Sequence, residues 1–323
     1  MIKILDTTLR EGEQAAGVKF TLEQKVEIAK MLDDFGVDYI EAGMPAISEE
    51  DYDKVKAVAD LGLNAEIVAL ARAKREDIDA VKETGAQWVG IFCGINERYS
   101  EVNLNGNSFG ETVHMIHKAL LYAKELDLKV KYTLEDASRT KPNLINELLY
   151  FITSNYRAID LIDRLCFADT TGNELCGAHS PDFFFDFFKP TKFKTWETEA
   201  HFHNDLGIAL ANSLWVSYLN DNVTISCSLN GLGERAGITS LTEYCLYYSN
   251  IPKYKNKWKL SLLPKLSQKV AEYSGIKPDP LRPIIGKNAF THTANLHKRA
   301  VKINPKCYEP FDPSIVGRER SFG

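Results

Sequence analysis

Short apolar runs rich in β-branched residues alternate with amphipathic helical stretches from the N-terminus to about residue 251. This alternation predicts parallel strands joined by crossover helices. We expect eight strands, at residues 2–8, 37–45, 65–72, 87–95, 129–136, 163–171, 198–205 and 223–231. In the first helical stretch, Thr21 is placed to cap the start and Gly36 to end it. Eight such units predict a (β/α)8 TIM barrel, an α/β fold. An open doubly wound sheet is disfavoured, because "REGEQAAG" stands where its G-x-G-x-x-G fingerprint would follow the first strand.

The alternation breaks down after about residue 251. Residues 251–275 resemble a linker and a helix, residues 276–286 are rich in proline, and residues 288–301 predict a further helix. A segment of this size is too small for a core of its own, so we expect it to dock on the barrel or on a partner subunit. The sequence therefore predicts a barrel over residues 1–251 and a small, mainly helical C-terminal subdomain over residues 252–323.

Composition narrows the partners and the compartment. A net charge of −5 over 323 residues gives no general attraction to phosphates, so neither nucleic acid nor a membrane is an expected partner. The six cysteines form no C-x-x-C pair, which fits neither a disulfide scaffold nor a zinc knuckle. Cys93, Cys166 and Cys227 lie in strand-like runs and are expected to be core thiols. This use of cysteine favours the reducing cytoplasm. No apolar run is long enough to cross a bilayer, so we expect a soluble protein that is not exported.

The active site of a TIM barrel lies at the C-terminal ends of its strands. Side chains capable of chemistry gather at the predicted strand ends, namely Asp6, Arg10, Glu11, Gln14, Glu41, Glu135, Arg139, Asp169, Thr170, His201, His203 and the loop "NGLGERAG" at residues 230–237. That loop, taken alone, could be a simple turn with a surface Glu–Arg pair.

The stretch "HFHND" places His201 and His203 two residues apart on a predicted strand. Residues i and i+2 of a strand point the same way, so both imidazoles face one site. A packed structural pair is the alternative, but two imidazoles followed by Asn204 and Asp205 favour a metal or catalytic site. With Glu11 as a third ligand, about three positions of an octahedral ion stay open for water or substrate. The same ligands could serve a non-haem iron oxygenase or a hydrolytic zinc enzyme.

Two arginines are candidates for holding a substrate carboxylate. Arg10 precedes the proposed ligand Glu11, and Arg139 follows a different strand. Guanidinium groups bind carboxylates through paired hydrogen bonds. The alternative is that one or both are ion-paired scaffold arginines.

The segments "LDTTLREGEQAAGVKFT", "HFHNDLGIALANS" and "NGLGERAG" resemble the signature segments of the homocitrate synthase and 2-isopropylmalate synthase family of metal-dependent enzymes. The stretches "AFTHTANLHKRAV" and "CYEPFDPSIVG" resemble the subdomain that follows the barrel in these enzymes. The resemblance implies an acyltransferase of amino-acid biosynthesis that condenses acetyl-CoA with a 2-oxo acid in a Claisen reaction. It implies that Glu11, His201 and His203 hold a divalent ion, for which magnesium, manganese and zinc are equally suited.

The resemblance also implies roles for further residues. The expected substrate contacts are Arg10, Gln14, Glu41, Lys74, Arg139 and Thr170. His297 and Tyr308 are implied to take part in proton transfer at the barrel of a neighbouring subunit, which makes a homodimer the expected assembly. Glu135 is another candidate acid or base. Packing within the subdomain is the alternative role for His297 and Tyr308.

The preferred 2-oxo acid is less directly indicated. Glu11 and Ile238 resemble the homocitrate synthases, which use 2-oxoglutarate. Lys74 stands where those enzymes tend to carry a histidine near the distal carboxylate of the oxo acid, and it could pair with that carboxylate or point to solvent. Pyruvate or 2-oxoisovalerate, as in citramalate and 2-isopropylmalate synthases, are the alternatives. A lyase of the 3-hydroxy-3-methylglutaryl-CoA type is disfavoured, because the loop at residues 230–237 holds no cysteine, and a non-catalytic barrel is disfavoured by the full ligand set.

Overall fold

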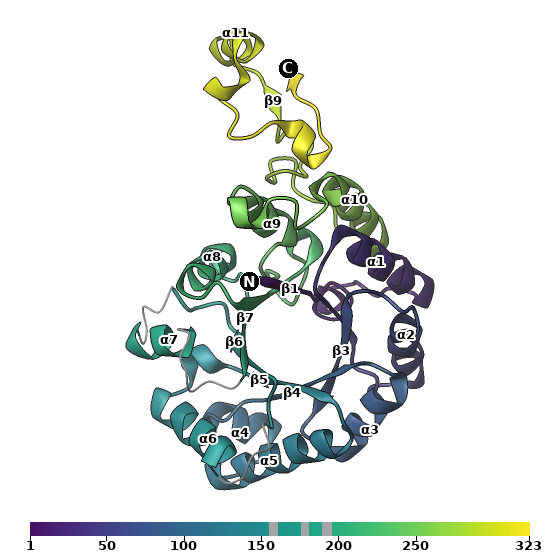
Figure 1. The fold of residues 1–323 in the computed structure, drawn as a ribbon, viewed down its shortest axis with the longest axis vertical. Helices are drawn as coiled ribbons and strands as arrows, with labels where there is room; N and C mark the ends of the chain where they lie inside the picture. The colour runs from purple at the N-terminus through teal and green to yellow at the C-terminus, as the bar shows by residue number, and fades with distance from the viewer. Residues whose placement is uncertain (155–160, 176–180, 189–195) are drawn as a thin grey trace.

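The computed structural model describes residues 1–154, 161–175, 181–188 and 196–323. Within these ranges, eight parallel strands close into a barrel in the order β1 to β8 (Figure 1). The strands are β1 Lys3–Asp6, β2 Tyr39–Gly43, β3 Glu66–Arg72, β4 Trp88–Cys93, β5 Lys129–Leu134, β6 Arg164–Asp169, β7 Glu197–Phe202 and β8 Val223–Cys227. Each of the eight predicted strands is confirmed, and the fold is the predicted TIM barrel.

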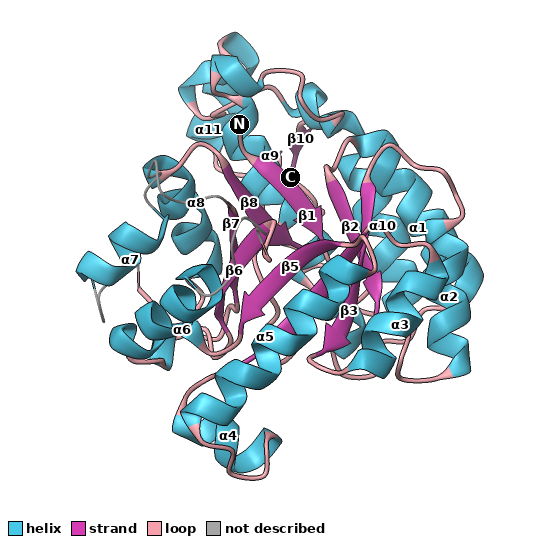
Figure 2. Cartoon of the chain, turned by 60° about the horizontal axis from the view of Figure 1, so that its bottom comes forward, coloured by secondary structure: helices cyan, strands magenta, loops and turns pink. Residues whose placement is uncertain are grey.

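Helices surround the strands on the outside of the barrel (Figure 2). They are α1 Leu22–Phe35, α2 Glu49–Ala59, α3 Arg75–Thr84, α4 Glu97–Asn103, α5 Phe109–Glu125, α6 Pro142–Ser154, α7 Pro181–Phe188, α8 Ala209–Leu219 and α9 Leu241–Ser249. Helix α1 begins as the sequence predicts, because the Thr21 side chain accepts the N–H of Gln24 at 3.2 Å while the Gln24 side chain accepts the N–H of Thr21 at 2.9 Å. It ends at Gly36, whose φ of +103° is open to glycine.

The barrel closes where β1 pairs with β8. Lys3 aligns with Thr224 and Asp6 aligns with Cys227, so no strand edge is left open. One large hydrophobic core lies between the strands and the helices, and Leu5, Tyr39, Val68 and Trp88 form a small second cluster on the inward face of their strands. Side chains alternate between these two regions along each strand. The inward-facing positions nearer the C-terminal ends of the strands are therefore available for a functional site.

The cysteines agree with the expectation of core thiols. Cys93, Cys166 and Cys227 are buried and free, and Cys176 lies outside the described residues. Each helix in the part of the chain that the structure describes is too short or too polar to span a bilayer.

The chain continues beyond the barrel into helix α10 Leu263–Ser274, which packs against α1 and joins the large core. The predicted division at residue 251 stays a prediction. The rest of the tail holds strands β9 Thr291–His292 and β10 Ser321–Phe322, which pair in parallel, and helix α11 Asn295–Ile303. This tail projects away from the barrel (Figure 1). Helix α11 buries Val301 but leaves Leu296 and Ile303 exposed.

Candidate active site

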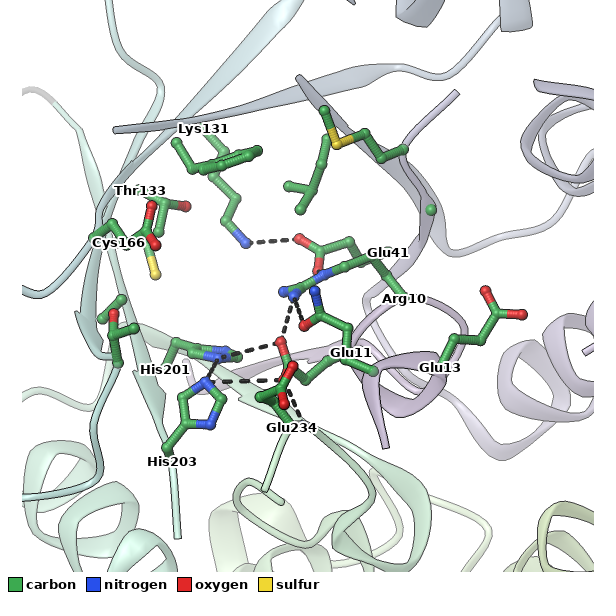
Figure 3. Close-up of a pocket in the computed structure, with 18 of the residues that line it drawn as sticks. Arg10, Glu11, Glu13, Glu41, Lys131, Thr133, Cys166, His201, His203 and Glu234 are labelled. Carbon is green, nitrogen blue, oxygen red and sulfur yellow. Dashed lines mark hydrogen bonds and ion pairs between the residues drawn. The ribbon is translucent and has the colours of Figure 1, made fainter. Parts of the chain in front are cut away.

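A pocket of about 570 Å³ opens at the C-terminal ends of the barrel strands (Figure 3). Its walls include Arg10, Glu11, Gln14, Glu41, Met44, Leu70, Phe92, Lys131, Thr133, Glu135, Cys166, Thr170, His201, His203, Glu234 and Arg235. Both charged and apolar side chains line it, so it suits a small polar ligand with an apolar portion.

Three donor groups converge at one wall of this pocket (Figure 3). Glu11, His201 and His203 each offer an atom, and these atoms lie within 4.8 Å of one another. Oε2 of Glu11 is 3.8 Å from Nε2 of His201, and Oε1 of Glu11 is 3.9 Å from Nε2 of His203. The two Nε2 atoms are 3.3 Å apart. His201 lies on β7 and His203 follows the strand directly, so the two-residue alternation brings both rings to the same site, as the sequence predicts.

The charge states of these groups fit a bound cation. Burial lowers the pKa of His201 to about 3, and burial also lowers the pKa of His203, so both imidazoles are neutral near pH 7. Burial alone would raise the pKa of Glu11, but the Arg10 guanidinium holds it at about 2. Nδ1 of His203 is buried and has no hydrogen-bond partner among the described residues. One carboxylate and two neutral imidazoles are a suitable ligand set for a divalent metal ion.

Glu11 is held from two sides. Its backbone N–H donates to the carbonyl of Thr7 at 2.8 Å, which starts a single 3-10 turn after β1. From the loop after β8, the N–H of Glu234 donates to Oε1 of Glu11 at 3.0 Å. Gly233 makes this approach possible, because a Cβ atom there would lie 3.1 Å from Cγ of Glu11. The loop "NGLGERAG" is therefore a support of the site rather than a simple surface turn.

The same loop is tied to the strand that carries the histidines. Arg235 pairs with both carboxylate oxygens of Asp205, at 2.7 and 2.9 Å, and donates to the carbonyl of Thr170 at 2.7 Å. Its φ is +56°, in the left-handed region. Paired arginine–carboxylate hydrogen bonds fix orientation as well as distance. The loop after β8 thus connects β1, β6 and β7 around the pocket.

Arg10 is fixed by two carboxylates while part of its guanidinium still lines the pocket. Nε of Arg10 lies 2.6 Å from Oε2 of Glu41, and Nη1 pairs with Glu11. Nη1 also donates to the side chain of Gln14 at 3.2 Å. A guanidinium has five N–H donors, so donors remain for a ligand.

Glu135 stands on the wall formed by β5. Its Oε2 is buried and has no hydrogen-bond partner in the described part of the chain. Burial raises the pKa of this carboxyl group above its ordinary value. A carboxyl group of this kind exchanges protons closer to neutral pH than an exposed one, which suits an acid or base.

Comparisons with known proteins decide the family. The HMGL-like family model matches residues 1–270, and the model described as homocitrate synthase post-HMGL domain-like matches residues 284–323. A homocitrate synthase of Pyrococcus abyssi is 42% identical over 328 residues, covering 99% of this chain and 85% of the relative. The chain belongs to the homocitrate synthase and 2-isopropylmalate synthase family. The resemblance in the signature segments is therefore confirmed, and with it the class of acyl-transferring enzymes.

Members of this family that resemble the chain carry different names. A 2-isopropylmalate synthase of Methanocaldococcus jannaschii is 35% identical over 322 residues, covering 99% of this chain and 60% of that relative. Among solved structures, an HMG-CoA lyase of Bacillus subtilis superposes with a TM-score of 0.72 at 20% identity, covering 87% of this chain and 95% of the lyase. That likeness shows the shared barrel fold alone.

The structure brings together most of the substrate contacts expected for the family. Arg10, Gln14, Glu41 and Thr170 all line the pocket. Glu41 is fully buried, and it holds Arg10 and Lys131 rather than standing free. Thr170 uses its hydroxyl oxygen to accept the N–H of Asp136 at 2.8 Å.

Two other expected contacts lie outside the pocket lining. Lys74 is exposed at the residue that precedes α3. Arg139 is exposed and pairs with both oxygens of Asp136, at 2.7 and 2.9 Å, which is the scaffold role that the sequence left open. Neither residue is among those that line this pocket, and their contact with a substrate stays a prediction.

His297 and Tyr308 lie together in the tail. Their rings stack with centroids 3.8 Å apart and an interplanar angle of 21°. Neither lines the pocket of its own chain. The pair therefore lies apart from the candidate metal ligands of the same chain.

Sequence reasoning missed Lys131. This lysine is buried in the pocket wall, where its Nζ lies 2.7 Å from Glu199 and 3.1 Å from Glu41. Burial alone would lower its pKa, but the two carboxylates raise it above the ordinary value, so the ammonium stays charged. The available signal was the two-residue period, which places Lys131 on the same face as Thr133 and Glu135.

Proposed function

We propose that this protein catalyses the metal-dependent Claisen condensation of acetyl-CoA with a 2-oxo acid, and that 2-oxoglutarate is the preferred oxo acid, giving homocitrate and free CoA. The observation that carries the proposal is a pocket in which Glu11, His201 and His203 face two fixed cations, Arg10 and Lys131. A dicarboxylic oxo acid needs a metal site that its oxo and carboxylate oxygens can chelate, and a second cation for its distal carboxylate.

The distal carboxylate would meet Lys131 rather than Lys74. An ammonium group has three N–H donors, and Glu199 and Glu41 take two of those on Lys131. The third is available to the pocket, and a buried cation binds an anion more strongly than an exposed one. Lys74 lies in solvent, where screening weakens such an interaction.

At the other end of the substrate, Glu11, His201 and His203 would hold a magnesium, manganese or zinc ion. When bound, that ion supplies Lewis-acid polarisation of the ketone. Arg10 donates to the carboxylate or carbonyl oxygen beside it, held in place by Glu41. These contacts orient the ketone carbon toward the methyl group of acetyl-CoA.

Proton transfer completes the reaction. A base removes one proton from the acetyl methyl group, the new carbon–carbon bond forms, the ketone oxygen takes up a proton, and water then hydrolyses the thioester to release CoA. Glu135 is the candidate acid or base within the barrel. We propose that His297 and Tyr308 of a neighbouring subunit contribute to this transfer, since their stacked pair lies away from the pocket of its own chain. A homodimer follows from that role.

One observation favours a second candidate substrate. Leu70 and Phe92 also line the pocket, and they would pack against an uncharged side chain such as that of 2-oxoisovalerate or the methyl group of pyruvate. Because an apolar wall does not strongly reject related substrates, the choice between a charged and an apolar oxo acid depends on Lys131.

The reducing cytoplasm is the compartment that we infer. Cys93, Cys166, Cys227, Cys245 and Cys307 are free thiols, as expected where disulfides are kept reduced.

The test is thiol release from acetyl-CoA by the metal-loaded protein with 2-oxoglutarate, pyruvate, 2-oxoisovalerate and oxaloacetate, each alone. We expect the highest kcat/KM with 2-oxoglutarate. Lys131→Met should reduce that value at least tenfold, the discrimination typical of an unpaired buried polar group, and Lys74→Ala should leave it within about twofold. A preference for another oxo acid would retain the chemistry and correct the substrate, and no thiol release with any of them would contradict the proposal.

A further inference from the structure

A continuous series of alternating charges runs through the barrel interior beneath the pocket. From the pocket toward the N-terminal ends of the strands, it consists of Glu11, Arg10, Glu41, Lys131, Glu199, Arg164, Glu197 and Lys3. Each residue in this series forms an ion pair with the next. Below Arg10, the three carboxylates and three cations cancel, so the interior beneath the pocket is neutral overall.

Arg164 is fully buried and is the last fully buried residue of this series before Glu197 and Lys3. Its guanidinium carbon lies 3.9 Å from the centroid of the Tyr39 ring and 4.4 Å from that of Trp88. Nη2 is 3.0 Å from Glu197 and Nη1 is 3.4 Å from Glu199. Held between two aromatic rings and two carboxylates, this planar group has little freedom to move.

Glu199 connects Arg164 to the pocket. One of its oxygens faces Arg164, and the other accepts from Lys131 at 2.7 Å and from the hydroxyl of Ser226 at 2.8 Å. The charge of Glu199 is therefore shared between two cations. Arg164 itself is absent from the pocket lining, so it would act on a ligand without touching it, through its charge and through Glu199 and Lys131.

Removal of the Arg164 charge would change what Lys131 presents to the pocket. Glu199 would then have Lys131 as its one remaining cation among the described residues, while Glu41 would keep both Arg10 and Lys131, and the interior beneath the pocket would carry one excess negative charge. Charges interact strongly in a poorly solvated interior. An anionic group in the pocket would be repelled, and the Lys131 ammonium would be drawn toward the two carboxylates.

We propose that Arg164 is a positioning residue that sets the preference of the pocket for a substrate with a second carboxylate, because it balances Glu199 and leaves Lys131 available to that carboxylate. This inference rests on the proposed function, in which Lys131 binds the distal carboxylate of the oxo acid. It extends substrate selection to a residue that touches no substrate.

The experiment measures dissociation constants by calorimetry on the metal-loaded full-length protein without acetyl-CoA. The probes are 2-oxoglutarate and pyruvate, which share the chelating end and differ in the distal carboxylate. Arg164→Met keeps an unbranched apolar stem but removes the charged guanidinium group that stacks on Tyr39 and Trp88. Lys3→Met is the matched control, because Lys3 pairs with Glu197 and has no recorded contact with Glu199 or Lys131 among the described residues.

We expect Arg164→Met to weaken 2-oxoglutarate binding at least tenfold and pyruvate binding threefold or less, while Lys3→Met changes neither by more than about twofold, as for a screened partly exposed pair. Adding Glu199→Gln to Arg164→Met restores charge balance, so the double variant should bind 2-oxoglutarate within threefold of the original protein. A purely structural role of Arg164 would weaken both ligands together and would not be rescued by a second substitution.

The outcomes separate this inference from the proposed function. If the unmodified protein does not bind 2-oxoglutarate, the proposed substrate fails and the inference fails with it. If it binds 2-oxoglutarate but Arg164→Met binds it equally well, or loses both ligands without rescue, the inference alone is overturned. Should Arg164→Met not fold by circular dichroism, Glu199→Gln alone provides the test with the opposite sign. It should bind 2-oxoglutarate at least threefold more tightly, and unchanged or weaker binding would overturn the inference.

Discussion

The backbone N–H of Glu234 donates a hydrogen bond to Oε1 of Glu11, which ties the loop after β8 to the candidate metal ligand after β1. The loop approaches this closely because Gly233 has no side chain. A hydrogen bond of this kind orients a ligand carboxylate, and such supporting contacts affect metal affinity nearly as much as the ligands do.

Gly233→Ala is predicted to weaken divalent-metal binding about tenfold, because the new Cβ would lie 3.1 Å from Cγ of Glu11 and displace the carboxylate. Titration with manganese, followed by calorimetry, measures the effect. Gly110→Ala is the matched control, since a Cβ there meets no atom within 4 Å and the residue lies within α5. That control should bind the metal normally, and an equal loss in both variants would contradict the role of the loop.

Glu135→Gln is predicted to lower kcat by about 10²–10⁴, the usual range for loss of a general acid or base, with oxo acid binding nearly unchanged. Burial raises the pKa of Glu135 above 4.5. The carboxyl group therefore stays protonated to a higher pH than an exposed glutamate. If a step needs the carboxylate form, its rate should fall as pH is lowered through the raised pKa, which lies above 4.5. The pH profile of kcat, measured for both proteins, should lose this fall in the variant. A variant with the original kcat and profile would exclude Glu135 from proton transfer.

The sequence predicts the barrel well because its information is local. The two-residue period marks the strands, and the same period places His201 and His203 on one face without knowledge of any other strand. Helix α1 is equally local, since Thr21 and Gln24 make their contacts within one turn. These features need no long-range pairing to be recognised.

The electrostatics of the interior are not local. Lys131 sits in the stretch "KVKYTLED", which reads as an ordinary amphipathic strand, and its burial depends on Glu41 of β2 and Glu199 of β7. Only closure of the barrel brings these three strands around one interior. Arg139 shows the opposite case, because its partner Asp136 lies three residues away and the pair is visible in the sequence. A strand-end arginine with a nearby aspartate is best treated as paired.

The proposed contribution of His297 from a neighbouring subunit predicts complementation between inactive proteins. His297→Ala and Glu11→Ala should each have little activity alone. In a mixed dimer, one site carries both defects and the other carries neither, so random mixing should restore about a quarter of the original activity by symmetry. The measurement is thiol release after the two proteins are unfolded together and refolded. If His297 serves its own barrel, the mixture should remain as inactive as its components.

Asp6 predicts a specific dependence of stability on pH. Its carboxyl group is fully buried at the end of β1, where Oδ1 accepts the N–H of Thr8 at 2.9 Å and Oδ2 has no hydrogen-bond partner among the described residues. Burial raises its pKa to about 7. In the unfolded chain the pKa returns to about 3.9, so between these values the folded protein binds one proton more than the unfolded protein.

Folding stability is therefore predicted to fall as pH rises from about 4 to 7, and the contribution of Asp6 to this loss is about 4 kcal/mol at most, from about three pKa units. Asp6→Asn has no charge to bury, so its free energy of unfolding should lack this contribution. Urea unfolding at pH 5 and pH 8, with a chelator present so that metal binding does not contribute, measures the difference. The free energy of unfolding of the variant minus that of the original protein should be larger at pH 8 than at pH 5. Parallel changes in the two proteins would show that Asp6 is already ionised in the folded state at pH 5, and that another group neutralises it.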